Sequence, residues 1–201
     1  MNKAKTLDTR KLVLLALLTA IVVVLQILAI VTRPLFPAFS ISLVLMPIAI
    51  GAALIGVYAG AWLGLAFGAA VLISDVDVAP FMAVNPAGTI LVVLLKGILA
   101  GLASGAVYKL ISGKSKTAAA IAAAVVCPVV NSGVFVIGCY AFFIPTLELW
   151  AAGAGDFANV TTYIFIGMVG VNFLVEMGIN LVLSPTIVRL IQYGQDKRGV
   201  I

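Results

Sequence analysis

Lysine, glutamate and asparagine side chains interrupt the apolar stretches in the second half of this chain. Lys96, Asn131, Asn172 and Glu176 each stand deep inside such a stretch. A charged group that faces lipid costs several kcal/mol, so these side chains are expected to face the interior of a helix bundle. There they offer an ammonium for an anionic group, a carboxylate for a hydrogen-bond donor, and two amides. Their types predict a polar pocket for a small solute.

The spacing of these residues favours shared helix faces near the middle of the bilayer. Two series repeat every four residues: Asn131, Phe135 and Cys139 in one stretch, and Asn172, Glu176 and Asn180 in the next. Residues four apart lie on one face of a helix, at a rise of about 1.5 Å per residue. Thr89, Phe135 and Tyr140 are expected nearer the outer mouth. The predicted substrate contacts are Asn85, Thr89, Lys96, Asn131, Phe135, Asn172 and Glu176.

The polar residues of the chain leave three alternatives to solute binding open. Lys96 and Glu176 could form an ion pair that only fixes the register of two helices. They could instead relay ions or protons in an autonomous secondary transporter or channel, although 201 residues without an obvious inverted repeat leave little room for two moving halves. A membrane enzyme with a metal on Asp75 and Asp77 is a third class, but two acids alone make a poor divalent site.

The amino-acid composition excludes a water-soluble protein and several kinds of catalytic and metal site. The chain has 9% charged and 64% hydrophobic residues, too few polar groups to cover a water-soluble globule or to form a basic nucleic-acid face. It has no histidine, which excludes histidine-based acid–base catalysis and histidine metal sites. Cys127 and Cys139 are too few for a zinc site and are expected to be small buried residues. We therefore expect neither an enzyme nor a bound metal or cofactor.

The elements that position these residues are predicted to be membrane-spanning helices in one domain over residues 1–201. Uncharged stretches predict six spans, at about residues 12–32, 42–57, 59–74, 86–111, 117–144 and 161–191. Pro47 is expected to bend the second span, and the following turn is placed at Gly56 to Gly60. Asn85 and Pro86 are expected to begin the fourth span as cap and first helical residue. The predicted fold is an all-α, compact bundle of six transmembrane helices.

The distribution of charge predicts the orientation of this bundle. With six crossings both termini share one side, which collects every basic residue except Arg33 and Lys96, so both termini are predicted to be cytoplasmic. Four of the seven acidic residues, Asp75, Asp77, Glu148 and Asp156, fall in segments expected to be outer polar loops, at residues 75–85 and 148–156. Glycines at every fourth residue over 56–68 and 97–105 predict close helix packing.

Ala16 and Ala20 form an Ala-x-x-x-Ala pair on the first span. Together with six short spans, inside termini and a basic cytoplasmic stub, this pair resembles the membrane-embedded substrate-binding S components of energy-coupling factor (ECF) vitamin transporters. The stretches 85–89, 96–97 and 127–131 are also similar to members of that group. As a pattern, the resemblance covers nearly the whole chain.

The resemblance implies a receptor for a water-soluble vitamin or related micronutrient in the bacterial cell membrane. In that family the ligand lies toward the outer side among helices four to six, covered by two loops, which correspond here to residues 33–42 and 75–85. The loaded protein docks through helix one, here Ala16 and Ala20, onto a transmembrane coupling protein that carries two ATPases. It is then thought to topple in the membrane to release its substrate inside.

Overall fold

A computed structural model of the chain describes residues 9–32, 43–74 and 78–196, and these residues are almost entirely helical. The elements are α1 (Thr9–Thr32), α2 (Leu45–Leu54), α3 (Val57–Ser74), α4 (Val78–Val84), α5 (Pro86–Ile111), α6 (Lys116–Phe142), α7 (Ile144–Ala154), α8 (Val160–Thr162), the π-helix η2 (Tyr163–Gly170) and α9 (Val171–Asp196). No strand occurs in the described ranges, so the all-α prediction is confirmed for them.

Several of these helices have the length and apolar character of membrane spans. Four qualify in the described part of the chain: α1, α5, α6, and the continuous helical segment Val160–Leu183 that runs from α8 through η2 into α9. A fifth candidate is the pair α3 and α4, whose axes differ by 79°. α2 has 10 residues, about 15 Å, half the thickness of the hydrocarbon core. The chain is thus a multi-pass membrane protein, and the count of six crossings stays a prediction.

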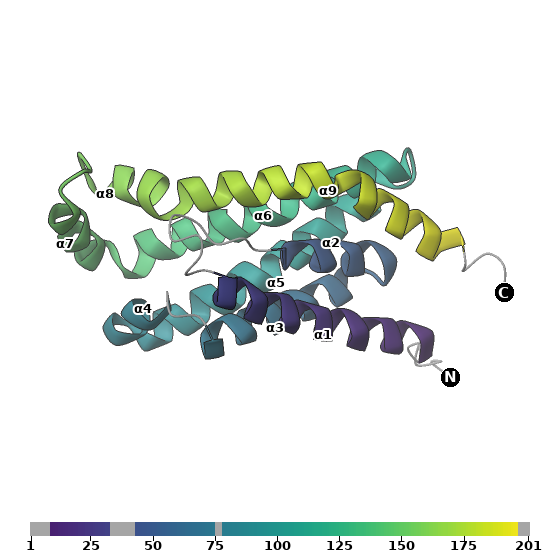
Figure 1. The fold of residues 1–201 in the computed structure, drawn as a ribbon, viewed down its shortest axis with the longest axis horizontal. Helices are drawn as coiled ribbons and strands as arrows, with labels where there is room; N and C mark the ends of the chain where they lie inside the picture. The colour runs from purple at the N-terminus through teal and green to yellow at the C-terminus, as the bar shows by residue number, and fades with distance from the viewer. Residues whose placement is uncertain (1–8, 33–42, 75–77, 197–201) are drawn as a thin grey trace, which may run out of the picture.

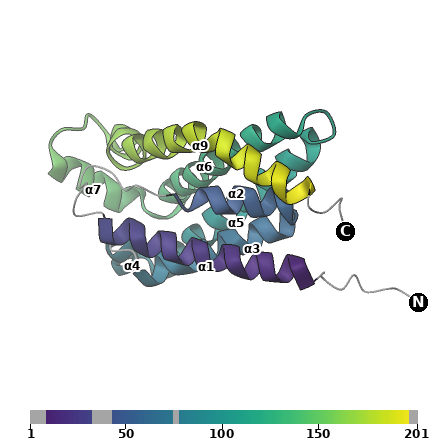
Figure 2. The same ribbon diagram turned by 45° about the vertical axis from the view of Figure 1, so that its right-hand side comes forward.

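The long helices lie side by side and enclose α2 (Figure 1). α1, α3 and α5 lie on one side of the bundle, and α6 and α9 on the other, as the turned view also shows (Figure 2). α2 contacts all five of these helices. Its residues are apolar on every side and nearly all buried, with Ile48 fully inaccessible, as expected of a helix in the middle of a bundle.

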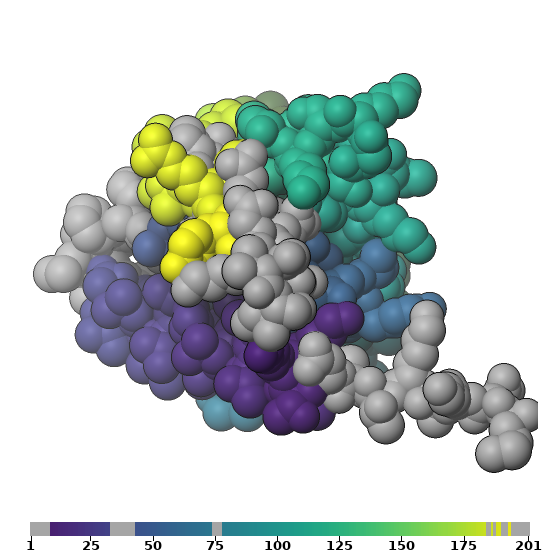
Figure 3. All heavy atoms as spheres, turned by 90° about the vertical axis from the view of Figure 1, so that its right-hand side faces the viewer, coloured from purple at the N-terminus to yellow at the C-terminus, as the bar shows by residue number. Residues whose placement is uncertain are grey.

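Basic residues gather at one end of the bundle. α1 begins and α9 ends at the same end, where the turn between α5 and α6 also lies (Figures 1 and 3). The exposed basic side chains of these segments are Arg10, Lys109, Lys114, Lys116 and Arg189. α4 and α7 lie at the opposite end.

Two local predictions need correction. The turn before α3 consists of two residues, Ile55 and Gly56, and not five, because Gly56 has a φ of 137°, which side-chain-bearing residues rarely adopt, and α3 begins at Val57. Pro47 lies in the first turn of α2 and not inside a span. Its missing N–H therefore costs no helical hydrogen bond, and the expected cause of a bend is absent.

The segments expected to be polar outer loops contain helices. Residues 78–84 form α4, and residues 144–154 form α7, each with a proline in its first turn. The sequence prediction followed the acidic residues, but the apolar residues between them pack inward: Leu147 is fully buried, and Phe81 packs against the cluster of Cys139, Phe143, Leu147 and Ile164. Asp75, Asp77 and the segment 33–42 lie outside the described residues.

The glycine series bring α3 and α5 into backbone contact. A Cβ at Gly64 would overlap the carbonyl oxygen of Gly97, and one at Gly60 would come within 2.5 Å of the carbonyl oxygen of Gly101. Close packing through these glycines is therefore confirmed. α5 is also bonded to α6, because Ser104 donates a hydrogen bond of 3.0 Å to the carbonyl of Ala123. α5 is thus held between α3 and α6, and Lys96 lies next to this contact.

Candidate functional site

The start of α5 is fixed by its own sequence. The side chain of Asn85 accepts a hydrogen bond of 2.9 Å from the backbone N–H of Gly88, and Pro86 occupies the first turn, so the predicted cap is confirmed. Thr89 donates its hydroxyl to the carbonyl of Asn85 at 2.8 Å. Lys96 follows Thr89 by seven residues, which places both on one face of the helix.

A cavity of about 570 Å³ lies between the two sides of the bundle. Its volume is that of a typical small-molecule site. It is lined by six of the seven predicted substrate contacts, namely Thr89, Lys96, Asn131, Phe135, Asn172 and Glu176. The seventh, Asn85, is not among the lining residues, because its side chain caps α5.

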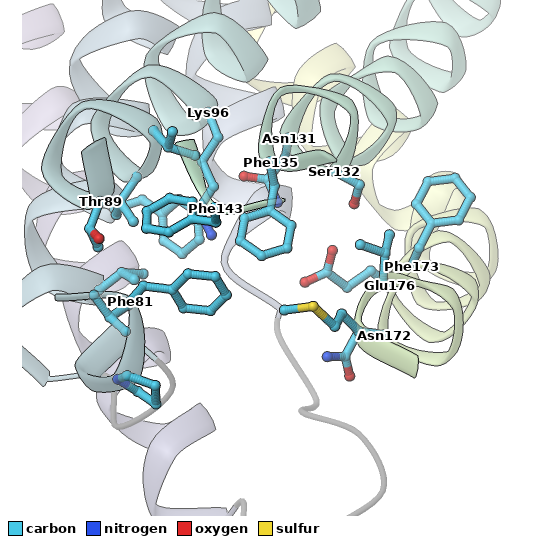
Figure 4. A pocket seen from close by; sticks show the side chains of 18 of the residues that line it. Phe81, Thr89, Lys96, Asn131, Ser132, Phe135, Phe143, Asn172, Phe173 and Glu176 are labelled. Carbon is cyan, nitrogen blue, oxygen red and sulfur yellow. The ribbon is translucent and has the colours of Figure 1, made fainter. Parts of the chain in front are cut away.

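Opposite charges reach into this cavity from facing helices. Lys96 extends from α5 and Glu176 from α9, with the ring of Phe135 between them (Figure 4). The ammonium of Lys96 lies 5.5 Å from the ring centroid of Phe135 and 5.8 Å from that of Phe67, both within the range of cation–π attraction. Lys96 and Glu176 also interact electrostatically with each other. The cavity can therefore receive both an anionic group and a hydrogen-bond donor.

Asn131 presents an unsatisfied acceptor in the same cavity. Its side chain is 7% exposed, and its Oδ1 has no hydrogen-bond partner among the described residues. Leaving a buried acceptor unpaired costs about 1–3 kcal/mol, which a donor on a bound solute would recover. Asn180, one turn beyond Glu176, does not line the cavity, and its Nδ2 donates instead to the backbone carbonyl of Glu176 at 2.9 Å.

Aromatic rings form a further wall that the sequence pattern did not predict. Phe81 of α4 packs edge-to-face against Phe143 at 5.0 Å, Trp150 at 5.4 Å and Phe135 at 6.0 Å between ring centroids. All four rings line the cavity. Phe81 and Trp150 were not recognised because they lie in segments expected to be loops. Such a wall favours a solute with an apolar or aromatic part.

The π-helix η2, which directly precedes α9, also lines the cavity. Tyr163, Gly167 and Met168 of η2 line it, just before Asn172. Wide helical turns of this kind occur frequently at functional sites. Tyr140, considered as an outer-mouth residue, lies outside the lining and donates to the hydroxyl of Thr161 at 2.9 Å.

Cysteine and acidic residues do not cluster into a metal site in the described part of the chain. Cys127 and Cys139 are free and buried, with exposed fractions of 0% and 1%, in agreement with the prediction of small buried residues. The thiol of Cys127 donates to the carbonyl of Leu45 at 3.8 Å, which ties α6 to α2.

Comparison with known families identifies the family to which the chain belongs. The family model of the ECF transporter, substrate-specific component, matches residues 10–188. The chain belongs to this family. The suspected S component is thereby confirmed, and the protein is a substrate-specific membrane component of a transporter. No curated protein and no solved structure matches this S component.

The predicted docking residues of the S component lie outside the cavity. Ala16 and Ala20 are exposed on α1, whereas Leu18, Val22 and Gln26 of the same helix are buried. The exposed side of α1 combines these two small residues with large apolar ones, including Val13 and Val24. A surface of this kind suits lipid or another membrane helix.

Proposed function

We propose that this S component binds a water-soluble vitamin or related micronutrient in the cavity and delivers it to an ECF-type importer of the ABC class. The observation that carries this proposal is the convergence of Lys96, Glu176 and the Oδ1 of Asn131, unpartnered among the described residues, on one cavity of about 570 Å³. The importer would supply a transmembrane coupling protein and two ATPase subunits, as the family implies. The chain itself would bind and release solute and would not act as an enzyme.

Each lining group has a distinct role in this proposal. Lys96 binds an anionic group, Glu176 accepts from a donor, and Asn131 accepts a second hydrogen bond. Asn172 and Thr89 add polar contacts at two other edges of the cavity. Phe135 packs against an apolar or ring-shaped part of the solute.

The same proposal includes six crossings of the bacterial cell membrane with both termini in the cytoplasm. Two observations support it. α1 begins and α9 ends at one end of the bundle, as an even number of crossings requires (Figure 1). That end carries the exposed basic residues of the α5–α6 turn, in accordance with the positive-inside rule. Ala16 and Ala20 then form the docking face for the coupling protein.

Ligand screening tests the binding function. We expect the purified S component alone to bind one member of a vitamin panel and to unfold at a higher temperature when it is present, through linkage. The panel contains riboflavin, thiamine, biotin, folate, pantothenate, pyridoxine, nicotinate and nicotinamide. Calorimetry on the best compound gives its Kd. If no compound binds or shifts the melting temperature, the proposed substrate class is wrong.

A transport measurement separates the receptor from an autonomous carrier, the second candidate. The two opposite charges in one cavity would also serve an ion or proton relay. In proteoliposomes we expect uptake only when the coupling protein, both ATPases and ATP are present. Uptake by the S component alone, driven by an ion gradient, would establish the carrier instead.

A further inference from the structure

An uncharged amide on α1 also lines the cavity. Gln26 is the only carboxamide in the apolar run of residues 12–32, and its side chain is 4% exposed. It lies on the buried face of α1 with Val22, one turn away, but Val22 does not reach the cavity and Gln26 does. A glutamine at this depth is unusual, because transfer of an amide from water to an apolar environment is costly unless it is hydrogen-bonded.

The two threonines in the apolar run of residues 12–32 donate their hydroxyls to carbonyls of the same helix. Thr19 donates its hydroxyl to the carbonyl of Leu15 at 2.7 Å, and Thr32 donates to the carbonyl of Leu28 at 2.9 Å. No hydrogen bond to the amide of Gln26 is found in the part of the chain that the structure describes. Gln26 therefore has a donor and an acceptor to offer inside the cavity.

Gln26 lies on α1, whereas the other polar side chains of the proposed binding site lie on different helices. Lys96 lies on α5, Asn131 on α6, and Asn172 and Glu176 on α9. A solute that contacts Gln26 as well as Asn131 would be held by helices from both sides of the bundle. Within the described ranges the Oδ1 of Asn131 lacks a partner, and a solute that also contacts the amide of Gln26 would bind to both side chains at once.

We propose, on the basis of the function proposed above, that Gln26 is a substrate-binding residue and that the solute carries an amide-type group. A carboxamide presents an acceptor and a donor side by side, and its best complement is a group with the reverse arrangement. Lactams, ureas, carboxamides and amino-substituted ring nitrogens have this arrangement. The solute would place this group against α1 and its remaining polar groups against Lys96 and Glu176.

Substitution of Gln26 by methionine tests the contact, because methionine has similar length but cannot hydrogen-bond as an amide does. We expect Gln26→Met to raise the Kd of the best panel compound at least tenfold, and to leave the melting temperature of the unliganded protein equal or higher. Leu18→Met, on the same buried face of α1 but outside the cavity, should change the Kd less than threefold.

The outcomes separate this inference from the proposed function. An unchanged Kd in Gln26→Met, with tight binding by the wild type, overturns the role of Gln26 alone. A fall in the melting temperature of unliganded Gln26→Met with an unchanged Kd assigns Gln26 a purely structural role. Preference for nicotinate over nicotinamide and over every other amide-bearing panel member overturns the solute class. If the wild type binds no panel compound, the proposed function fails and this inference fails with it.

Discussion

At the residue scale, the half-buried charges of Lys96 and Glu176 could serve either a binding site or a structural ion pair, and substitution separates the two roles. We expect Lys96→Met and Glu176→Gln each to weaken binding of the best panel vitamin more than tenfold, about 1.4 kcal/mol, because each removes a charged contact to the solute. Titration calorimetry measures the change. Lys109→Met, an exposed lysine in the last turn of the same helix, serves as the control.

The double variant Lys96→Met/Glu176→Gln tests the alternative that the two residues form only a structural ion pair. If the two residues only pair with each other, each single variant leaves an unpaired charge in the cavity and loses stability, while the double variant recovers it. Vitamin affinity would then be the same in all three proteins. That pattern would contradict a role of Lys96 and Glu176 in the binding site.

The chemistry of individual residues determines which site positions were predictable. Charged or amide groups in apolar stretches are costly, so Lys96, Asn131 and Glu176 indicated an interior site from sequence alone. Gln26 was missed because it lies on the helix that the Ala16 and Ala20 pair assigned to docking. Phe81 and Trp150 were missed for another reason: they lie in segments expected to be loops, and a phenylalanine in a core has the same local sequence pattern as one in a binding cavity.

At the element scale, the contact of α3 with α5 sets the position of Lys96. We expect Gly64→Ala to lower stability by about 1–3 kcal/mol, because the added methyl group would overlap the carbonyl of Gly97 and force the helices apart. Thermal unfolding in detergent measures the loss. Gly133→Ala is the matched control, since nothing lies within 4 Å of a Cβ at this exposed position in α6. Equal stability of the two variants would contradict the close contact.

Helix boundaries were predictable where residues at the boundary itself determine them. Asn85 and Pro86 fix the start of α5, and the predicted span 86–111 has the same bounds as the helix. α4 and α7 were not predicted, because short helices near charged residues form through contacts with distant parts of the chain. Phe81 illustrates this, since its partners Phe143 and Trp150 lie more than sixty residues further along the chain.

At the scale of the whole molecule, the proposed binding and docking sites lie on different surfaces. We expect Ala16→Leu and Ala20→Leu to leave vitamin affinity unchanged but to abolish uptake with the complete importer, because a large side chain prevents close approach of a partner helix. Ala141→Leu, at an exposed alanine of α6, should affect neither property. Calorimetry and proteoliposome uptake measure the two effects. A loss of affinity in Ala16→Leu would show that the surfaces are coupled within the free protein.

The positions of the two tryptophans provide intrinsic fluorescence reporters for both surfaces. Trp62 and Trp150 are the two tryptophans of the sequence. Trp150 lines the cavity, whereas Trp62 is exposed on α3 and donates to the hydroxyl of Thr19, the neighbour of Ala20, at 3.2 Å. Replacing one indole by phenylalanine leaves a single emitter, so quenching of Trp150 follows solute entry and a spectral shift of Trp62 follows partner contact. Both steps of a transport cycle can thus be timed without attaching a dye.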